Sequence, residues 1–381
     1  MASAGSPAIR SPSRPASAAE HQPWLSWQRW AVRLLAALPL IALALWTAHR
    51  GFASGELRLL EHRADLLRGG GPDLKSLRYG YPPLPLLLAI ILPGGTLALS
   101  ITACLFSGVI LTYLAERLLR RLPVPATLAL LAAFVAVPAM WYASTQLIAT
   151  DASLAFLAIA LGAFIRFTAR GETEGGFVAG IALALAYGFD PGAILFAVVM
   201  CAVAPLISHV RYQDDPAATV GIAAVVFFPV AAATLSWFFL VWKFAGTFPG
   251  SLAYAAGAHP FTFPAGVGRG LARAAVTTGL DVLHVPLYLI VAVGLYRLRP
   301  LATVGLVLPI VALAISLWLG FPYPQLSAFF MFTVLALVIV ADTASRQNRH
   351  VLILAAVAQL ALAICWPPAS PGFTAWLHAV T

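Results

Sequence analysis

Acidic and basic side chains gather in one segment of a chain that is otherwise poor in charge. Between positions 55 and 81 this segment holds four carboxylates and five cations: Glu56, Glu61, Asp65, Asp73, Arg58, Arg63, Arg68, Lys75 and Arg78. A carboxylate can take a proton from a hydroxyl nucleophile, and an arginine can bind a phosphate through two parallel hydrogen bonds. The segment therefore carries the groups that general base catalysis on a phosphorylated substrate needs. One further carboxylate, Asp151, stands alone in the apolar stretch IATDASLAF.

Two short helices are expected to position these charges. Leu57, Leu60, Ala64 and Leu67 recur at helical spacing, which predicts an amphipathic helix over 54–68 lying at a membrane interface. The GGGP sequence at 69–72 ends this helix. The apolar run at 81–93 is too short to cross a bilayer and begins with prolines, so it predicts an interfacial or re-entrant helix.

The rest of the chain has the composition of a membrane protein. Of its 381 residues, 61% are hydrophobic and 10% are charged, whereas about a quarter of the residues of a soluble domain are charged. Apolar runs of roughly 20 residues, enough to cross a bilayer, recur along its length. We therefore expect an all-α polytopic membrane protein with about eleven transmembrane helices, at 32–49, 96–115, 125–143, 152–168, 175–190, 192–209, 218–241, 280–296, 301–320, 325–342 and 350–367.

The positions of the basic residues predict the orientation. Arginines occupy alternate loops, at 116–122, 166–174, 208–215, 296–300 and 345–350, which predicts a cytoplasmic N-terminus and a C-terminus outside. Residues 1–30, rich in Ser, Pro and Ala, are expected to form a disordered cytoplasmic tail, and 31–381 one transmembrane domain with an outer loop at 50–95. Because the basic groups are scattered between apolar segments, the net charge of +9 does not indicate a nucleic-acid partner.

Metal and nucleotide motifs do not occur in the sequence. It contains no P-loop, dinucleotide fingerprint or zinc motif, and its three cysteines (Cys104, Cys201 and Cys365) lie within or at the edge of apolar segments. Such scattered cysteines predict neither a disulfide framework nor a metal cluster. The sequence is compatible with a divalent cation and carries no motif that demands one.

Three stretches, in order along the first 170 residues, match the pattern of a known family. SGELRLLEHRADLLRGG is similar to an acidic pair followed by a helix and a glycine turn after the first span. RYGYPPLPLLLAI is similar to a short motif ending in Pro-Pro-Leu, and STQLIATDASLAFLAIALGAFIRF to an acidic residue that opens the fourth span. In these stretches the chain resembles the GT-C superfamily of membrane glycosyltransferases, which includes protein O-mannosyltransferases and aminoarabinose transferases of lipid A. It departs from the family at Gly55-Glu56, where the family has Asp-Glu, and at Asp190, where relatives carry Lys or Arg.

Seven residues are candidates for the site, and the resemblance implies the roles of four of them, Glu56, Asp151, Arg78 and Tyr81. Glu56 and Asp151 would be the catalytic carboxylates, and the substrate-binding residues would be Arg58, Glu61, Arg78, Tyr81 and Lys243. Structural alternatives stand beside these roles: an ion pair of Glu56 with Arg58 or Arg63, an N-cap at Asp151, an interfacial anchor at Arg78 and Tyr81, and an ordinary juxtamembrane lysine at Lys243. Asp190, in the sequence GFDPG, favours a turn over a ligand.

The implied reaction follows from the side of the membrane. A site outside the bacterial inner membrane has no access to cytoplasmic nucleotide sugars, so the donor would be a sugar on a polyprenyl phosphate and the acceptor a hydroxyl of a glycan, lipid or protein. A single displacement helped by one carboxylate base would invert the anomeric centre. The alternatives are a non-catalytic GT-C-like protein that binds a lipid-linked glycan or scaffolds another enzyme, which Gly55 favours, and a transporter or flippase.

Overall fold

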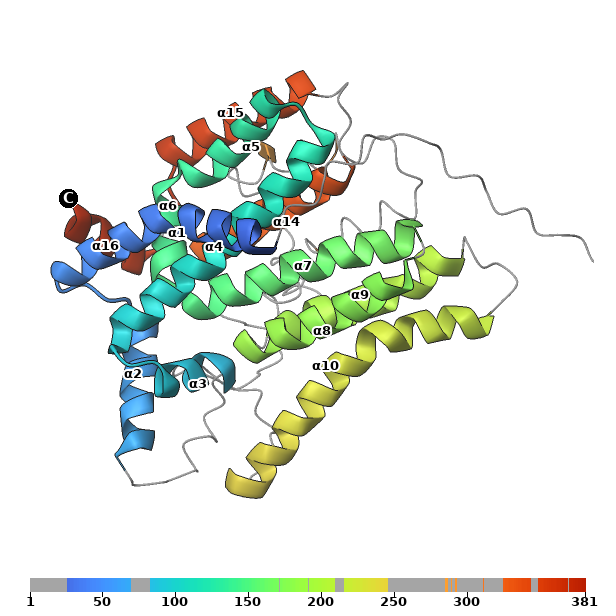
Figure 1. Cartoon of the computed structure of the whole chain (residues 1–381), viewed down its shortest axis with the longest axis horizontal. Coiled ribbons are helices and arrows are strands. Elements are labelled where there is room, and N and C mark those ends of the chain that lie inside the picture. Colours follow the sequence, from blue (N-terminus) through green and yellow to red (C-terminus); the bar gives the residue numbers. More distant parts are fainter. Residues whose placement is uncertain are drawn as a thin grey trace, which may run out of the picture.

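The computed structural model describes residues 26–69, 83–170, 172–190, 192–209, 216–245, 325–343, 349–368 and 370–381, with isolated positions between 285 and 311. Every regular element in these ranges is a helix (Figure 1). The helices are α1 (Ser26–His49), α2 (Gly55–Arg68), α3 (Pro83–Ile91), α4 (Gly95–Arg121), α5 (Val124–Val135), α6 (Pro138–Gln146), α7 (Ile148–Arg170), α8 (Thr173–Phe189), α9 (Ala193–His209), α10 (Pro216–Ala245), α14 (Gln325–Thr343), α15 (Arg349–Cys365) and α16 (Pro371–Val380).

Several of these helices are long and apolar enough to cross a membrane, as expected. Four qualify among the described residues: Trp27–His49 in α1, Gly95–Arg121 in α4, Ile148–Phe167 in α7 and Ala223–Phe244 in α10. A bent pair, α5 with α6, would make a fifth. The expected spans at 175–190, 192–209, 325–342 and 350–367 correspond to helices whose apolar parts are shorter, and those at 280–296 and 301–320 lie outside the described residues apart from isolated positions. The count of eleven therefore stays a prediction.

The third expected span, at 125–143, is not one continuous helix. It breaks between α5 and α6, which meet at an angle of 67°. Pro138 explains the break, because a proline lacks the backbone N–H of a helical hydrogen bond and disfavours helical geometry in the residue before it. Val137 is accordingly extended, with φ −89° and ψ 118°. The apolar pattern of this stretch is the same for a straight and for a broken helix, so it did not indicate the bend.

Small residues let the helices approach closely. A Cβ atom on Gly108 of α4 would lie 2.6 Å from the carbonyl oxygen of Arg33 in α1, and one on Gly180 of α8 would lie 2.9 Å from that of Val226 in α10. Backbone contacts of this kind are typical of helices packed in membranes. In the apolar part of α7, 83% of the residues are buried, against 22% in α1 and 18% in α10. Hence α7 is the centre of the bundle, and α1 and α10 are peripheral.

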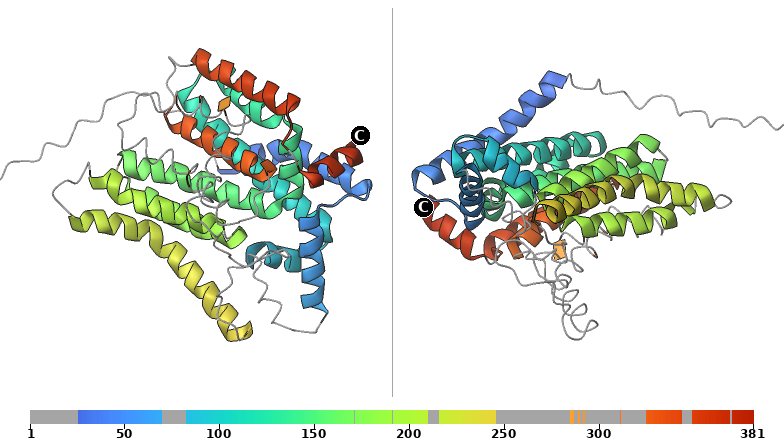
Figure 2. Two further views of the ribbon diagram at one scale, coloured as in Figure 1. Left: turned by 180° about the vertical axis from the view of Figure 1, so that it is seen from behind. Right: turned by 90° about the horizontal axis from the view of Figure 1, so that it is seen from below.

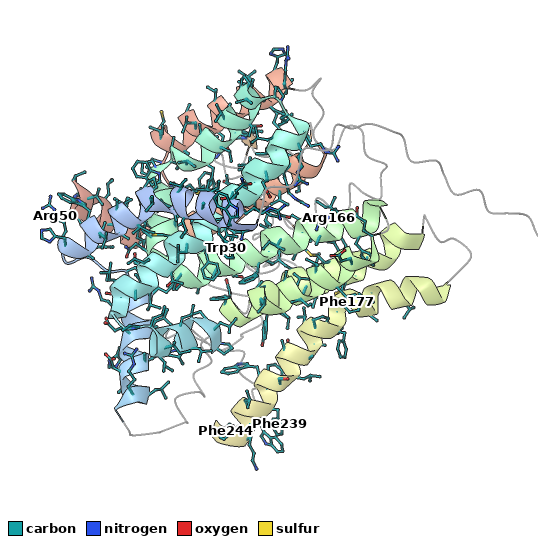
Figure 3. The ribbon with its side chains drawn as sticks, in the orientation of Figure 1. Trp30, Arg50, Arg166, Phe177, Phe239 and Phe244 are labelled. Atoms are coloured by element: carbon teal, nitrogen blue, oxygen red, sulfur yellow. The ribbon has the colours of Figure 1, made fainter. Side chains whose placement is uncertain are left out.

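The bundle has two chemically different ends. At one end, which we call the basic end, Arg29 contacts Glu116 at 3.4 Å and Arg166 contacts Glu172 at 3.6 Å. Figure 3 places Arg166 and Arg50 at opposite ends of the bundle. We call the end with Arg50 the carboxylate end, since α2 with Glu56 begins there. The α2 helix runs across the direction of α1 and α7, both in Figure 1 and in the view from behind in Figure 2.

The C-terminal helix α16 packs at the carboxylate end. Phe373 and Trp376 of α16 lie against Tyr142 of α6, with ring centroids 5.9 and 5.8 Å apart. Because α15 separates this helix from position 347, we expect reporter fusions at Gln347 and Ser370 to report opposite sides of the membrane. Alkaline phosphatase and fluorescent protein fusions measure this directly. Finding both positions in one compartment would show that α15 does not cross.

Candidate functional site

The amphipathic helix expected at 54–68 is α2, and its start is tied to the end of α6. The Ser54 hydroxyl accepts a hydrogen bond from the N–H of Leu57 at 3.2 Å and donates one to the carbonyl of Gln146 at 2.7 Å. The side-chain oxygen of Gln146 accepts from the N–H of Ser54 at 3.0 Å. Serine at this position satisfies a backbone donor that the helix itself leaves free. Both side chains are buried, so the first turn of α2 has a fixed place beside the start of α7.

The apolar stripe of α2 packs as its spacing predicts. Leu57, Leu60 and Ala64 are buried in a cluster with Ala89 of α3, Leu99 and Ala103 of α4 and Ile148 of α7. Leu67, the fourth member of the expected stripe, is half-buried. This packing sets the rotation of α2 about its own axis and turns Glu56 toward α7.

Glu56 binds the first turn of α7. Its Oε1 atom accepts a hydrogen bond of 2.8 Å from the N–H of Ala149. The first amides of a helix have no partner within it, and the positive end of the helix dipole favours a carboxylate there. Burial raises the pKa of Glu56 from 4.5 to about 7; the nearby Asp190 adds to this, and the Ala149 N–H opposes it. A carboxylate with this pKa is suited to act as a general base near neutral pH.

Asp151 lies two residues further along α7 and is fully buried. The Ser107 hydroxyl of α4 lies 2.9 and 3.0 Å from the two oxygens of its carboxylate and donates to it. Asp151 and Glu56 interact electrostatically as well. A carboxylate is costly inside a bilayer unless it is hydrated or paired, and here the Ser107 hydroxyl is its partner.

Asp151 is not the N-cap of its helix, and its partner lies away from the end of α4. The residue is near the start of its own helix, as predicted, but its partner Ser107 lies halfway along the 27-residue α4. At about 1.5 Å per residue, this is roughly 18 Å from the first residue of α4. The alternative role as an N-cap does not describe Asp151, because its side chain reaches across to α4. Glu56, from another helix, provides the carboxylate at the start of α7.

The structure brings only part of the predicted site together. Glu61 lies against Gly95, where any Cβ would collide with its carboxylate at the start of α4. Arg58 is exposed on α2, and Lys243 is exposed in the last turn of α10. No contact among the described residues joins Arg58 or Lys243 to Glu56. Arg78 and Tyr81 lie outside the described residues, so the expected phosphate clamp has no described geometry.

From the sequence, Ser54, Gln146 and Ser107 were not singled out as partners of the candidate carboxylates, and Arg68 was only one of several cations of its segment. Ser54 and Gln146 hold Glu56 in place, and Ser107 binds Asp151. Arg68 donates to the carbonyls of Ile90 at 2.9 Å and Leu92 at 3.3 Å, and also to Ala89, at the end of α3. A guanidinium at the end of a helix satisfies its last carbonyls and opposes its dipole. Of these, only Ser54 carried a signal, as a serine directly before a helical pattern.

The predicted turn at Asp190 is confirmed. Its Oδ1 atom accepts a hydrogen bond of 2.8 Å from the N–H of Gly192, directly after α8 ends at Phe189. This is the local bonding that aspartate makes in turns. Because the electrostatic effect of Asp190 reaches Glu56, the same turn also contributes to the environment of the candidate base.

Comparison with known proteins leaves the site to be judged on its geometry. No family model, no curated protein and no solved structure matches the chain.

The raised pKa of Glu56 predicts how stability depends on pH. The buried carboxyl favours its protonated form in the folded protein, so its stabilising effect is complete below pH 4.5 and is lost as the pH rises through about 7. The variant Glu56→Gln keeps the hydrogen-bond acceptor and cannot ionise. We expect it to gain stability over the wild type between pH 5 and pH 8, by at most about 3 kcal/mol. Thermal unfolding in detergent at both pH values measures this.

The matched control is Asp65→Asn. It removes a carboxylate from the same helix, but the side chain of Asp65 is 62% exposed. We expect its difference from the wild type to be equal at both pH values. If Glu56→Gln also shows no pH-dependent gain, Glu56 is not a buried titrating group.

Proposed function

We propose that the chain is a glycosyltransferase of the GT-C type, with the GT-C fold and about eleven membrane spans. It transfers a sugar from a polyprenyl-phosphate donor to a hydroxyl of a glycan, lipid or protein acceptor, at the outer face of the bacterial inner membrane. The observation that carries the proposal is the position of Glu56. It is a partly buried carboxylate on an interfacial-type helix, with a pKa of about 7, bound to the first turn of α7 two residues before a second carboxylate, Asp151.

The chemistry needs a base and little else from the protein. Glu56 takes the proton of the acceptor hydroxyl as that oxygen attacks the anomeric carbon, and the C–O bond to the phosphate breaks with inversion. Phosphate is a good leaving group, so a carboxylic acid to protonate it is not required, in contrast to glycosidases. In this reaction Glu56 acts as the base, Asp151 is the second catalytic carboxylate, and Arg58, Glu61, Arg78, Tyr81 and Lys243 contact the donor and the acceptor.

The arrangement of helices supports this proposal independently of the base. A charged helix that lies across the bundle directly after α1, a short helix α3 beside it, and an acidic residue at the start of α7 follow the order of the three stretches that resemble the family. Arg68, by binding the end of α3, holds α2 and α3 together as one unit. The tail of a polyprenyl donor can stay in the bilayer while its phosphate reaches this unit.

The test is the turnover of Glu56→Gln. We expect a fall of at least about 100-fold, the usual contribution of a general base, with donor binding nearly unchanged because the volume is conserved. The wild-type rate should rise with pH through about 7. The measurement is release of polyprenyl phosphate from a panel of polyprenyl-phosphate sugars by protein reconstituted with native membrane lipids and acceptors. The control Asp65→Asn should keep wild-type turnover, and a fully active Glu56→Gln would move the base to another residue.

Gly55 distinguishes an enzyme from a non-catalytic relative. The family has Asp at this position, and a Cβ on Gly55 would meet no atom within 4 Å, so Gly55→Asp fits the structure. An aspartate in the first turn of α2 should also stabilise that helix slightly, by about 0.3–1 kcal/mol. If Glu56 is the base, turnover in Gly55→Asp should change less than about threefold. If the wild type is inactive and Gly55→Asp is active, the chain is a lipid-glycan-binding or scaffold protein that has lost its catalytic carboxylate.

A second candidate, transport, is favoured by two observations. Asp151 lies beside the middle of α4, and the α5–α6 pair is broken by 67°. Carboxylates at mid-depth and interrupted helices are typical of ion-coupled transporters. A proton flux into proteoliposomes that Asp151→Asn abolishes would place transport ahead of sugar transfer.

A further inference from the structure

A cluster of arginines lies where α1 begins and α4 ends, at the basic end of the bundle. The first two turns of α1 and the last two turns of α4 contain five arginines and one carboxylate: Arg29, Arg33, Arg117, Arg120, Arg121 and Glu116. This pair of helix ends is thus strongly positive. Both helices are long and apolar enough to cross a membrane. The arginines at these helix ends therefore lie near the membrane surface.

Arg29 and Arg33 each have a buried Nε–H group without a hydrogen-bond acceptor in the described structure. The Nε atom of Arg29 lies 3.4 Å from Glu116, but it forms no hydrogen bond there, and the Nε atom of Arg33 has no hydrogen-bond partner in the described structure. The guanidinium of Arg33 lies over the ring of Trp30, with its carbon 4.6 Å from the ring centroid. A shielded donor without an acceptor is costly. A ligand with anionic oxygens is what these guanidinium groups are suited to bind.

The outer side of α1 adds an apolar surface to this cluster. Trp27 and Trp30 are exposed near the start of the helix, and Leu34, Leu35 and Leu38 continue the exposed face toward its middle. Figure 3 shows Trp30 near the start of α1, in the half of this helix that is closer to the basic end. Tryptophan is typical of the boundary between headgroups and hydrocarbon. The ligand that fits both parts has an anionic head and long hydrocarbon chains.

We propose that the basic end of α1 and α4 binds an anionic glycerophospholipid of the leaflet that faces it. Arg29 and Arg33 contact the phosphate, Trp30 lies at the level of the ester groups, and the acyl chains follow Leu34, Leu35 and Leu38. Basic pockets between membrane helices bind anionic headgroups in this way. The site is at the opposite end of the bundle from Glu56, so it does not depend on the proposed sugar transfer.

The same helix provides a matched control at its other end. There the guanidinium of Arg50 lies 5.2 Å from the centroid of the Trp46 ring, and Leu45 and Trp46 are exposed. The two tryptophan–arginine pairs are therefore alike. However, α4 has no arginine in its first two turns, beginning at Gly95, so the second pair has no basic partner helix.

Native mass spectrometry of the full chain, released from nanodiscs of equal parts phosphatidylglycerol and phosphatidylcholine, tests the proposal. We expect the wild type to retain phosphatidylglycerol preferentially. Arg29→Gln and Arg33→Gln should each lower its retention roughly fivefold, because one arginine near an anionic surface contributes about 1 kcal/mol. Arg50→Gln should retain it as the wild type does. Arg33→Lys keeps the positive charge but loses the planar guanidinium group. Its retention of phosphatidylglycerol should lie between that of the wild type and that of Arg33→Gln.

Several results would overturn the proposal. Equal retention of both lipids, or an equal loss in Arg50→Gln, would show that any interfacial arginine acts in the same way. If inorganic phosphate displaces the lipid at equal concentration, the site recognises phosphate alone. If a polyprenyl phosphate displaces it more strongly, the site belongs to a prenyl lipid. Thermal unfolding of each variant shows whether it is folded, and Arg33→Lys serves as the test if Arg33→Gln is not.

Discussion

The start of α7 imposes a constraint that shapes much of the bundle. A helix that begins among buried side chains has backbone N–H groups that no residue within it can satisfy, so side chains of other elements must accept hydrogen bonds from them. Glu56 satisfies one of these groups, at Ala149. To bring Glu56 there, α2 must cross the bundle and begin beside the end of α6. The bonds between Ser54 and Gln146, the buried stripe of α2, and the attachment of α3 through Arg68 all serve that placement.

The same contact explains why a carboxylate here has unusual chemistry. Burial and a neighbouring carboxylate disfavour the charged form of Glu56, while the N–H of Ala149 favours it. The balance leaves the pKa near neutrality, where a small change in surroundings shifts the charge of the group. Catalytic acids and bases are commonly placed in such environments. The same carboxylate can serve the helix start and the reaction. One of its oxygens accepts the hydrogen bond from the helix, and the fixed side chain can accept a proton from a substrate.

The charged residues of the described chain differ between the two ends of the bundle. At the basic end, Arg29 pairs with Glu116, Arg166 pairs with Glu172, and the guanidinium of Arg33 lies over the ring of Trp30 on α1. Toward the other end, Glu56 binds the start of α7 and Asp151 binds the Ser107 hydroxyl, so both carboxylates are turned inward. Long cationic side chains can reach outward to headgroups. Short carboxylates cannot, so they must be satisfied by the protein.

The sequence by itself determined the helical class, the membrane character and the helix at 54–68, because apolar runs and a stripe at helical spacing depend only on neighbours along the chain. It also indicated Glu56 and Asp151 as candidate catalytic carboxylates. Only the tertiary structure decided that Glu56 binds α7, that Asp151 meets Ser107 at the middle of α4, and that α5 and α6 are separate helices. These features arise from contacts between residues some 40 to 90 positions apart, or from a bend that leaves the apolar pattern unchanged. Local patterns carry no information on such pairings, since any of several serines could have faced Asp151.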